Sequence, residues 1–283
     1  MTTAQKIIKY IATAFAIFLI VTIISAILSG GYVLLSAFGL IHTDKNIVTE
    51  DFKVISDEEV SSEVKEISTL KLELACTNLE IKTGNSFKVE TNNSKISFTE
   101  NNGSVKIKEE KHNWLMNNKD YTSSLVIYIP EDMIALDETK IETGAGKINI
   151  ERLNTQSLYL ELGAGDVYIK NLTVTKEAKI DGGIGRTELN SCEINYLKAN
   201  LGMGEFVFSG KLTGKSEVDS GVGAININLL DSSENYTIDV SKGIGSVTLD
   251  GQKLEMDRVY GTGENHLSVD GGVGEIKINF KGE

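Results

Sequence analysis

The residues best suited to chemistry in this sequence are carboxylates that recur at one place in a glycine-containing repeat. They stand two residues before the first glycine of successive Gly-x-Gly motifs, as Glu142, Glu161, Asp181, Asp219 and Asp270, with Asn200 and Ser241 at the same place in two further motifs. Stacked carboxylates repel one another, and a bound cation such as Ca²⁺ would relieve that repulsion. We expect a solvated, outward-facing column, because exposed charges interact weakly in water. The sequence leaves a cation site open.

Short enzyme-like motifs are present but incomplete. Ser62-x-x-Lys65 and Lys82-Thr83-Gly84 resemble two signatures of penicillin-recognising enzymes, yet Ser62 lies in a hydrophilic segment and no Ser-Asp-Asn occurs. The three histidines, His42, His112 and His266, lack metal-ligand spacing. The chain has no Gly-x-Ser-x-Gly, His-Glu-x-x-His or P-loop motif. We therefore predict that it is not an enzyme and assign no catalytic, cofactor-binding or metal-binding residue.

Two insertions, 111–123 and 255–266, interrupt the repeats and carry residue types that are common in binding hot spots. These candidate partner-binding residues are Trp114, Tyr121, Arg258 and Tyr260. Insertions in repeat proteins often form contact loops. The alternative, which we favour, is that the two segments fold over the repeat array and block pairing at its exposed strand edges.

The repeat itself is the strongest pattern in the sequence. Its glycine pairs are Gly144 and Gly146, Gly163 and Gly165, Gly183 and Gly185, Gly202 and Gly204, Gly221 and Gly223, Gly243 and Gly245, and Gly272 and Gly274. The first glycines are 19, 20, 19, 19, 22 and 29 residues apart. A period near 20 leaves room for two short strands and two bends, which predicts an all-β solenoid of stacked turns.

Apolar residues alternate with polar ones on both sides of each motif, for example at Phe206 and Phe208, as in half-buried strands. The residue between the two glycines is always apolar: Ala145, Ala164, Ile184, Met203, Val222, Ile244 and Val273. We expect this column to point inward, with the glycines letting the backbone bend sharply around it.

The solenoid is predicted to begin near Ser68, because LELACTNLEI (72–81) has the outline of a first turn with Ala75, Cys76 and Thr77 in place of Gly-x-Gly. Cys76 and Cys192, the only cysteines, both fall where the pattern requires an inward residue. We expect buried free thiols, although two cysteines alone do not exclude a bridge.

An apolar stretch near the start of the chain, 10–41, contains no charged residue and is long enough to cross a bilayer as a helix. It is too long for the apolar region of a signal peptide. Lys6 and Lys9 precede it and an acidic segment follows, which places the N-terminus in the cytoplasm. The predicted organisation is a cytoplasmic stub (1–9), a transmembrane anchor (10–41), an acidic spacer (42–67) and an extracytoplasmic β-solenoid (68–283).

The predicted external part holds 26 basic and 40 acidic residues, which leaves a formal charge of −14. Such a surface disfavours nucleic acid and anionic lipid headgroups as partners. The 25 lysines against 3 arginines are compatible with a low-GC Gram-positive source.

The anchor, the LELACTNLEIKTGNSFKVE unit, the SLVIYIPED strand and the repeated turns together resemble the bacterial "putative adhesin" β-strand-repeat family of unknown function, which includes LiaG-type envelope proteins. The resemblance spans about 68–280 and implies a membrane-associated β-solenoid without catalytic residues. The leading hypothesis is a binding or scaffold module at the outer membrane face that contacts wall polymer or an envelope protein. The alternatives are a regulator of a membrane sensor and an unrecognised glycan-active enzyme.

Overall fold

The structure is a computed structural model that describes residues 52–55, 67–110, 122–133, 135–254 and 259–282. The chain divides into two compact units, Met1–Asn46 and Ile47–Glu283, and all described residues belong to the second. The predicted cytoplasmic stub, the transmembrane anchor and most of the spacer lie outside the described residues. Within the described ranges, no helix has the length and apolar character needed to span a membrane.

The described unit is built almost entirely of strands, as predicted. They are β1 (Lys53–Val54), β2 (Thr69–Leu74), β3 (Thr77–Gly84), β4 (Lys88–Thr91), β5 (Ile96–Asn101), β6 (Ser104–Glu109), β7 (Ser123–Pro130), β8 (Leu136–Ala145), β9 (Ile148–Ile150), β10 (Leu153–Ala164), β11 (Val167–Lys170), β12 (Leu172–Asn195), β13 (Leu197–Thr213), β14 (Lys215–Leu229), β15 (Tyr236–Leu249), β16 (Gln252–Lys253), β17 (Tyr260–Gly261) and β18 (Asn265–Phe280). A single 3-10 turn, η2 (Ser233–Asn235), precedes β15.

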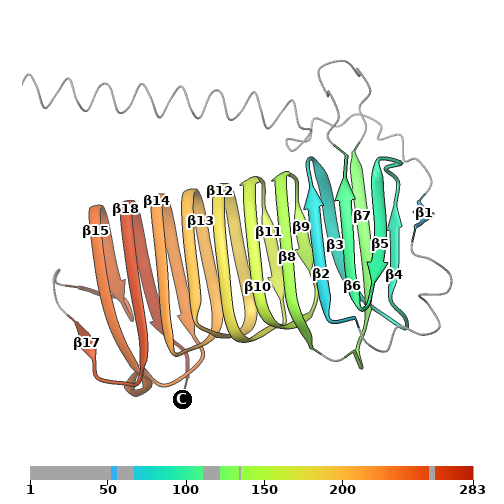
Figure 1. Ribbon diagram of the computed structural model, residues 1–283. Helices are drawn as coiled ribbons and strands as arrows, with labels where there is room; N and C mark the ends of the chain where they lie inside the picture. Colours follow the sequence, from blue (N-terminus) through green and yellow to red (C-terminus); the bar gives the residue numbers. More distant parts are fainter. Residues whose placement is uncertain (1–51, 56–66, 111–121, 134, 255–258, 283) are drawn as a thin grey trace, which may run out of the picture. The chain divides into compact units, whose positions relative to one another are not determined.

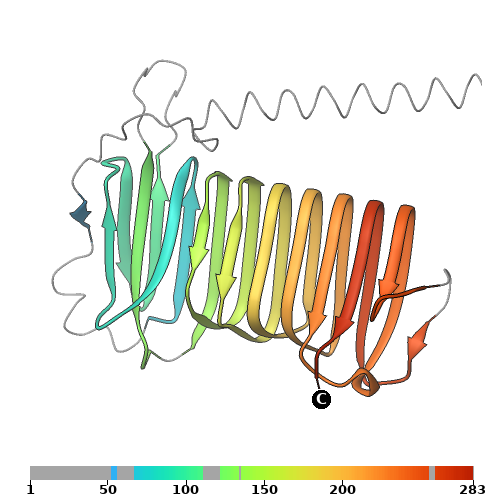
Figure 2. The same ribbon diagram turned by 180° about the vertical axis from the view of Figure 1, so that it is seen from behind.

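Each repeat forms one coil that rises through one layer of the sheet, bends at its Gly-x-Gly motif and descends through the other layer. β12, β13, β14, β15 and β18 each contain both limbs, whereas β8–β9 and β10–β11 divide the same path into two strands (Figure 1). Neighbouring coils pair in parallel along both limbs, as β12 and β13 do from Ala178↔Leu197 to Asn195↔Thr213. Figure 2, turned by 180°, shows the same coils from the side of the other layer. The predicted plan of two limbs per coil is therefore confirmed.

The order of the coils in space differs from their order in the chain at both ends. β18 lies between β14 and β15, pairing with both in parallel. The β2–β3 coil likewise lies between β6–β7 and β8–β9. The segment LELACTNLEI is thus the second coil of the stack rather than its outermost turn. The spatial order is β6–β7, β2–β3, β8–β9, β10–β11, β12, β13, β14, β18 and β15.

The core lies between the two layers and is filled by the alternating apolar residues predicted from the sequence. Leu158 and Leu160 on one limb, and Phe206 and Phe208 on the other, are at most 1% exposed. Burying each such side chain contributes about 1.5–3 kcal/mol to folding. Because no single coil can enclose its own apolar face, this stabilisation depends on stacking with neighbours.

Short antiparallel strands cover both ends of the stack. At one end β4 and β5 pair with β7 and β6, and β1 pairs with β4. At the other end β16 pairs with the descending limb of β15 and β17 with its ascending limb. Unpaired strand edges invite association with other chains, so these short strands limit that exposure.

Candidate binding surface along the glycine bends

The Gly-x-Gly bends of successive coils are stacked so closely that only glycine fits. The second glycine of each pair has φ between 140° and 151°, a conformation that L side chains rarely adopt. A Cβ on Gly185 would lie 1.8 Å from the carbonyl oxygen of Gly165, and one on Gly223 would lie 1.6 Å from that of Gly204. Backbone conformation and contact with the adjacent coil therefore both require glycine.

The side chain between the two glycines forms a row along the edge of the stack. In spatial order this apolar ladder comprises Ala145, Ala164, Ile184, Met203, Val222, Val273 and Ile244, each a register neighbour of the next. It runs through every coil from β8 to β15.

The prediction that this column points into the core is wrong for most of its members. Ala145 is buried, but Ile184, Val273 and Ile244 are 38%, 43% and 72% exposed, and the other members are half-buried. The core ends at the bend, so an apex side chain has the interior on one side only. The flanking glycines carry no side chain that could cover it. Ile244 is the most exposed because only β18 lies beside its coil at the level of the bend.

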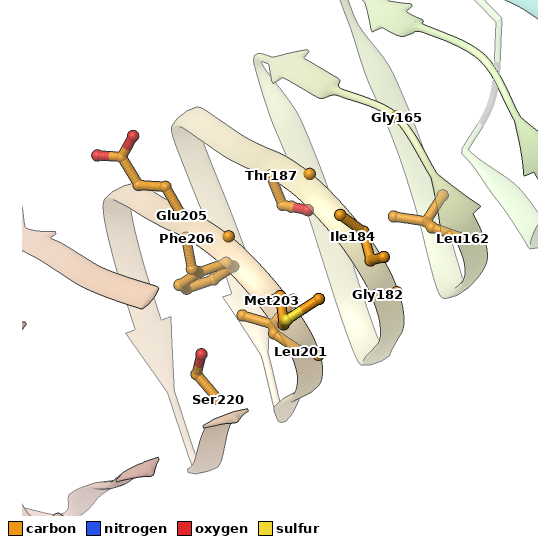
Figure 3. A pocket seen from close by; sticks show the side chains of 14 residues that line it. Leu162, Gly165, Gly182, Ile184, Thr187, Leu201, Met203, Glu205, Phe206 and Ser220 are labelled. Atoms are coloured by element: carbon orange, nitrogen blue, oxygen red, sulfur yellow. The ribbon is translucent and has the colours of Figure 1, made fainter. Parts of the chain in front are cut away.

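A shallow hollow opens between the bends of β12 and β13. Ile184 and Met203 from the ladder line it together with Leu162, Leu201 and Phe206, whereas the carboxylate of Glu205 points away (Figure 3). Its volume is about 320 Å³, which includes space open to solvent. The hollow is part of the ladder surface rather than an enclosed substrate pocket.

The acidic column predicted from the sequence flanks one side of the ladder. Register pairs join Glu142, Glu161, Asp181, Asn200, Asp219, Asp270 and Ser241 into one row, and Glu73 of β2 extends it. Its first half is neutralised. Lys140 lies 2.5 Å from Glu142 and 3.6 Å from Glu161, and Lys106 lies 2.5 Å from Glu73.

The second half of the column keeps its charge. Asp219 and Asp270 are direct register neighbours, and the described residues place no lysine or arginine within ion-pair distance of either. Partial burial, then the charges of Asp270 and Glu217, raise the pKa of Asp219 above its ordinary value. No group of three or more His, Cys, Asp or Glu residues with metal-binding geometry occurs in the described ranges.

The other flank of the ladder carries an ion-pair cluster around Arg186. Arg186 donates two hydrogen bonds to Glu188, at 3.0 and 2.8 Å. It also pairs with Glu205, its register neighbour on the next coil. The hydrogen bond to Glu188 is the main cause that raises the pKa of Arg186 and lowers that of Glu188. Glu275 of β18 pairs with Lys277 at 2.7 Å.

Of the four candidate partner-binding residues, Trp114, Tyr121 and Arg258 lie outside the described residues. Tyr260 lies in β17, pairs with Ile238 on the outer edge of β15 and packs against the core. The insertion that contains Trp114 leaves β6 after Glu109 and returns at β7. Because β2 and β3 pair with these two strands, the insertion begins and ends beside the first bend, at Ala75–Thr77.

Glu109 stabilises the Ala75–Thr77 bend, a role that was not predicted from the sequence. One of its carboxylate oxygens accepts hydrogen bonds from the backbone N–H groups of Ala75 and Cys76, at 2.7 and 3.1 Å. The other accepts from Asn93. Glu109 thus satisfies the backbone donors of the Ala75–Thr77 bend, beside which the next coil, β6–β7, has no Gly-x-Gly motif. No local sequence signal marks this glutamate, because its partners are 33 and 34 residues away.

The cysteines differ in environment. Cys192 is buried as predicted, but Cys76 is exposed because it occupies the apex position of its bend, and both are free thiols. Ser62 and Lys65 of the enzyme-like motif lie outside the described residues. Lys82 lies on β3 in an ion pair with Glu80 at 2.5 Å.

A family model described as Toastrack DUF4097 matches residues 67–279, which is nearly the whole described unit. The chain belongs to the Toastrack DUF4097 family. The Toastrack match begins at the first core residue, Ile67, and ends one residue before the end of β18. No curated protein matches this Toastrack chain.

Three solved structures are similar to the Toastrack unit. A "putative cell adhesion protein" from Clostridium sporogenes is 17% identical, with 82% of this chain and 99% of that chain covered and a TM-score of 0.32. A "putative adhesin" from Bacteroides fragilis is 14% identical, with 83% and 100% covered and a TM-score of 0.43. A "putative lipid binding protein" from Parabacteroides distasonis is 14% identical, with 80% and 96% covered and a TM-score of 0.41.

Proposed function

We propose that this chain is a non-enzymatic binding or scaffold module of the cell envelope, anchored in the membrane by residues 10–41 and displayed outside. The observation that carries the proposal is the apolar ladder, a continuous row of apolar side chains that are exposed or half-buried at every position except Ala145. Exposed apolar rows rimmed by charged residues are typical of interaction surfaces.

The shape of the surface favours binding over catalysis. Enzymes usually enclose a substrate in a concave pocket with a few convergent polar groups. The hollow beside Ile184 is shallow and is lined by apolar side chains, glycine backbone, Thr187 and Ser220. The one charged residue of its lining, Glu205, points away from it (Figure 3). The stack also holds the ladder at fixed spacing, because parallel pairing continues on both sides of each bend.

In-cell photocrosslinking tests the proposal. A photoreactive amino acid replaces Ile184 or Ile244 on the ladder, and Leu230, an exposed apolar residue away from it, serves as the matched control. Crosslinks to wall polymer or to an envelope protein from the ladder positions, and none from Leu230, are expected. Equal capture from all three positions, or from Leu230 alone, contradicts the proposal.

Replacing residues 1–41 by an unrelated membrane anchor separates binding from regulation. A binding module keeps its ladder crosslinks after the exchange. Loss of the crosslinks on exchange would instead support the regulatory alternative, in which the native anchor contacts a membrane sensor. Release of fragments from purified wall material by the full chain would revive the glycan-active alternative.

A further inference from the structure

We propose that the apolar ladder binds a basic amphipathic polypeptide segment, in which a row of apolar side chains is flanked by lysines or arginines. This inference rests on the proposed binding function and names the chemistry of the partner. It follows from two features that coincide in space: an uncovered apolar row and the carboxylates beside it.

The apolar part of the match is the segment of the ladder from Ile184 to Ile244. It passes through Met203, Val222 and Val273, so it crosses five adjacent coils. Coils about 4.8 Å apart give this segment a length of about 19 Å. A helix of about 13 residues, rising about 1.5 Å per residue, has the same length. The surface is therefore suited to three or four turns of an amphipathic helix laid along the stack.

The charged part of the match lies mainly on one flank. Asp181, Asp219 and Asp270 flank this segment on one layer. Glu205 and Glu275 flank it on the other layer, where Glu205 is paired with Arg186 and Glu275 with Lys277 at 2.7 Å. Lys242, next to Ser241 on β15, donates to the carbonyl oxygen of Gly245.

One row farther from the ladder, β14 and β15 carry the carboxylates of Glu217 and Asp239, with Ser268 of β18 between them. Glu217 is paired with Lys198 at 3.3 Å and with Lys215 at 3.7 Å. After partial burial, the charge of Asp270 is the next cause of the raised pKa of Asp219, and an incoming lysine or arginine would relieve this repulsion. Charge complementarity of this kind selects partners and speeds their association.

The same charges disfavour two other possible partners of the ladder, a second copy of this chain and an anionic lipid surface. A second copy of this chain would place its own carboxylates against these, and like charges at an interface are costly. An anionic lipid surface would be repelled for the same reason.

The test measures binding of fluorescent 14-residue helical peptides to the purified full-length chain in detergent micelles by anisotropy. One peptide carries leucines on one face flanked by lysines, and its matched control carries glutamates instead of lysines. We expect the lysine peptide to bind and the glutamate peptide not to bind. Raising the salt concentration should weaken the binding of the lysine peptide, because the flanking charges are exposed.

Variants locate the binding. Val273→Ser with Ile244→Ser is expected to weaken binding of the lysine peptide about tenfold, which corresponds to about 1.4 kcal/mol. Asp219→Asn with Asp270→Asn is expected to weaken it and to reduce its salt dependence. Leu230→Ser, an exposed apolar residue away from the ladder, should leave it unchanged. Circular dichroism of each variant confirms that the β-structure is retained.

Three outcomes overturn the inference: equal binding of both peptides, no binding of the lysine peptide, or an equal loss in Leu230→Ser. Binding of the chain without its N-terminal 46 residues to phosphatidylglycerol vesicles, or its ladder-dependent dimerisation, would likewise replace it with another occupant. If the peptide assay fails but the ladder positions still crosslink in cells, the proposed binding function stands and only the basic partner is excluded. If the ladder positions also fail to crosslink, the proposed binding function is contradicted as well.

Discussion

Gly204 lies directly against Gly185 in the stack, so that a Cβ on Gly204 would approach the carbonyl oxygen of Gly185 to 1.8 Å. The φ of Gly204 is 141°, which a side chain also disfavours. The two constraints have separate origins. The first comes from the adjacent coil and the second from the bend itself, so they can be separated experimentally.

Gly204→Ala is predicted to lower the free energy of unfolding by at least about 3 kcal/mol, because backbone strain and a backbone clash act together. Gly251→Ala is the matched control, since Gly251 has φ +76° but no atom within 4 Å of the added Cβ. It should cost only about 1 kcal/mol. Urea denaturation of both variants gives the comparison, and equal losses would show that the bends are not in contact.

Glu109→Ala is predicted to lower the free energy of unfolding by about 1–3 kcal/mol. It leaves the N–H groups of Ala75 and Cys76 without their acceptor. Glu110→Ala, at an exposed neighbouring position, is the control and should have little effect. Hydrogen exchange followed by mass spectrometry should show faster exchange at residues 75–76 in Glu109→Ala alone. Unchanged exchange there would contradict the capping role.

The two thiols should differ in accessibility. Burial raises the pKa of Cys192 to about 11, and burial followed by the charge of Glu109 raises that of Cys76. A maleimide is therefore expected to modify one thiol, Cys76, in the folded protein, and more slowly than a free cysteine at pH 7.5 because less thiolate is present. Both thiols should react in denaturant without a reductant. Recovery of a Cys76–Cys192 disulfide would contradict the structure.

Asp219 is predicted to destabilise the fold slightly at neutral pH. Its pKa is raised in the folded state, so its contribution is most favourable below the ordinary aspartate range and is lost as the pH rises through the folded-state value. Asp219→Asn should therefore increase stability at pH 7 by up to about 0.5 kcal/mol, a small value because the side chain is exposed. The gain should vanish at pH 3.

A double-mutant cycle tests the cause. In the Asp270→Asn background the gain from Asp219→Asn should shrink, because the neighbouring charge is absent. An undiminished gain would assign the effect to burial and to the charge of Glu217.

Much of the architecture could be predicted from the sequence, because the period of about 20 residues and the alternation at Phe206 and Phe208 are local patterns. The exposure of Ile184 and Ile244 could not, since alternation assigns a face to residues in straight strands but not at a bend. The Gly-x-Gly pattern itself does, however, contain a signal for this exposure. An apolar residue between two glycines has no neighbouring side chain in its own coil to cover it.

The position of β18 could not be predicted either, because the repeats resemble one another and Gly272 is suited to stacking on several of them. The 29 residues from Gly243 to Gly272 give the chain enough length to pass beyond β15 and return between β15 and β14. Glu109 escaped prediction because its role depends on a contact between distant parts of the chain.

Disulfide trapping along the ladder tests the stacked bends most directly. In a background with Cys76→Ser and Cys192→Ala, the pair Val222→Cys with Val273→Cys places thiols on adjacent coils, within the Cα separation that a disulfide requires. The pair Val222→Cys with Ile244→Cys is separated by one further coil, at about twice the 4.8 Å spacing. We predict rapid crosslinking of the first pair under mild oxidation and none of the second. Crosslinking of Val222→Cys with Ile244→Cys, without that of Val222→Cys with Val273→Cys, would contradict the stacking order and the ladder built on it.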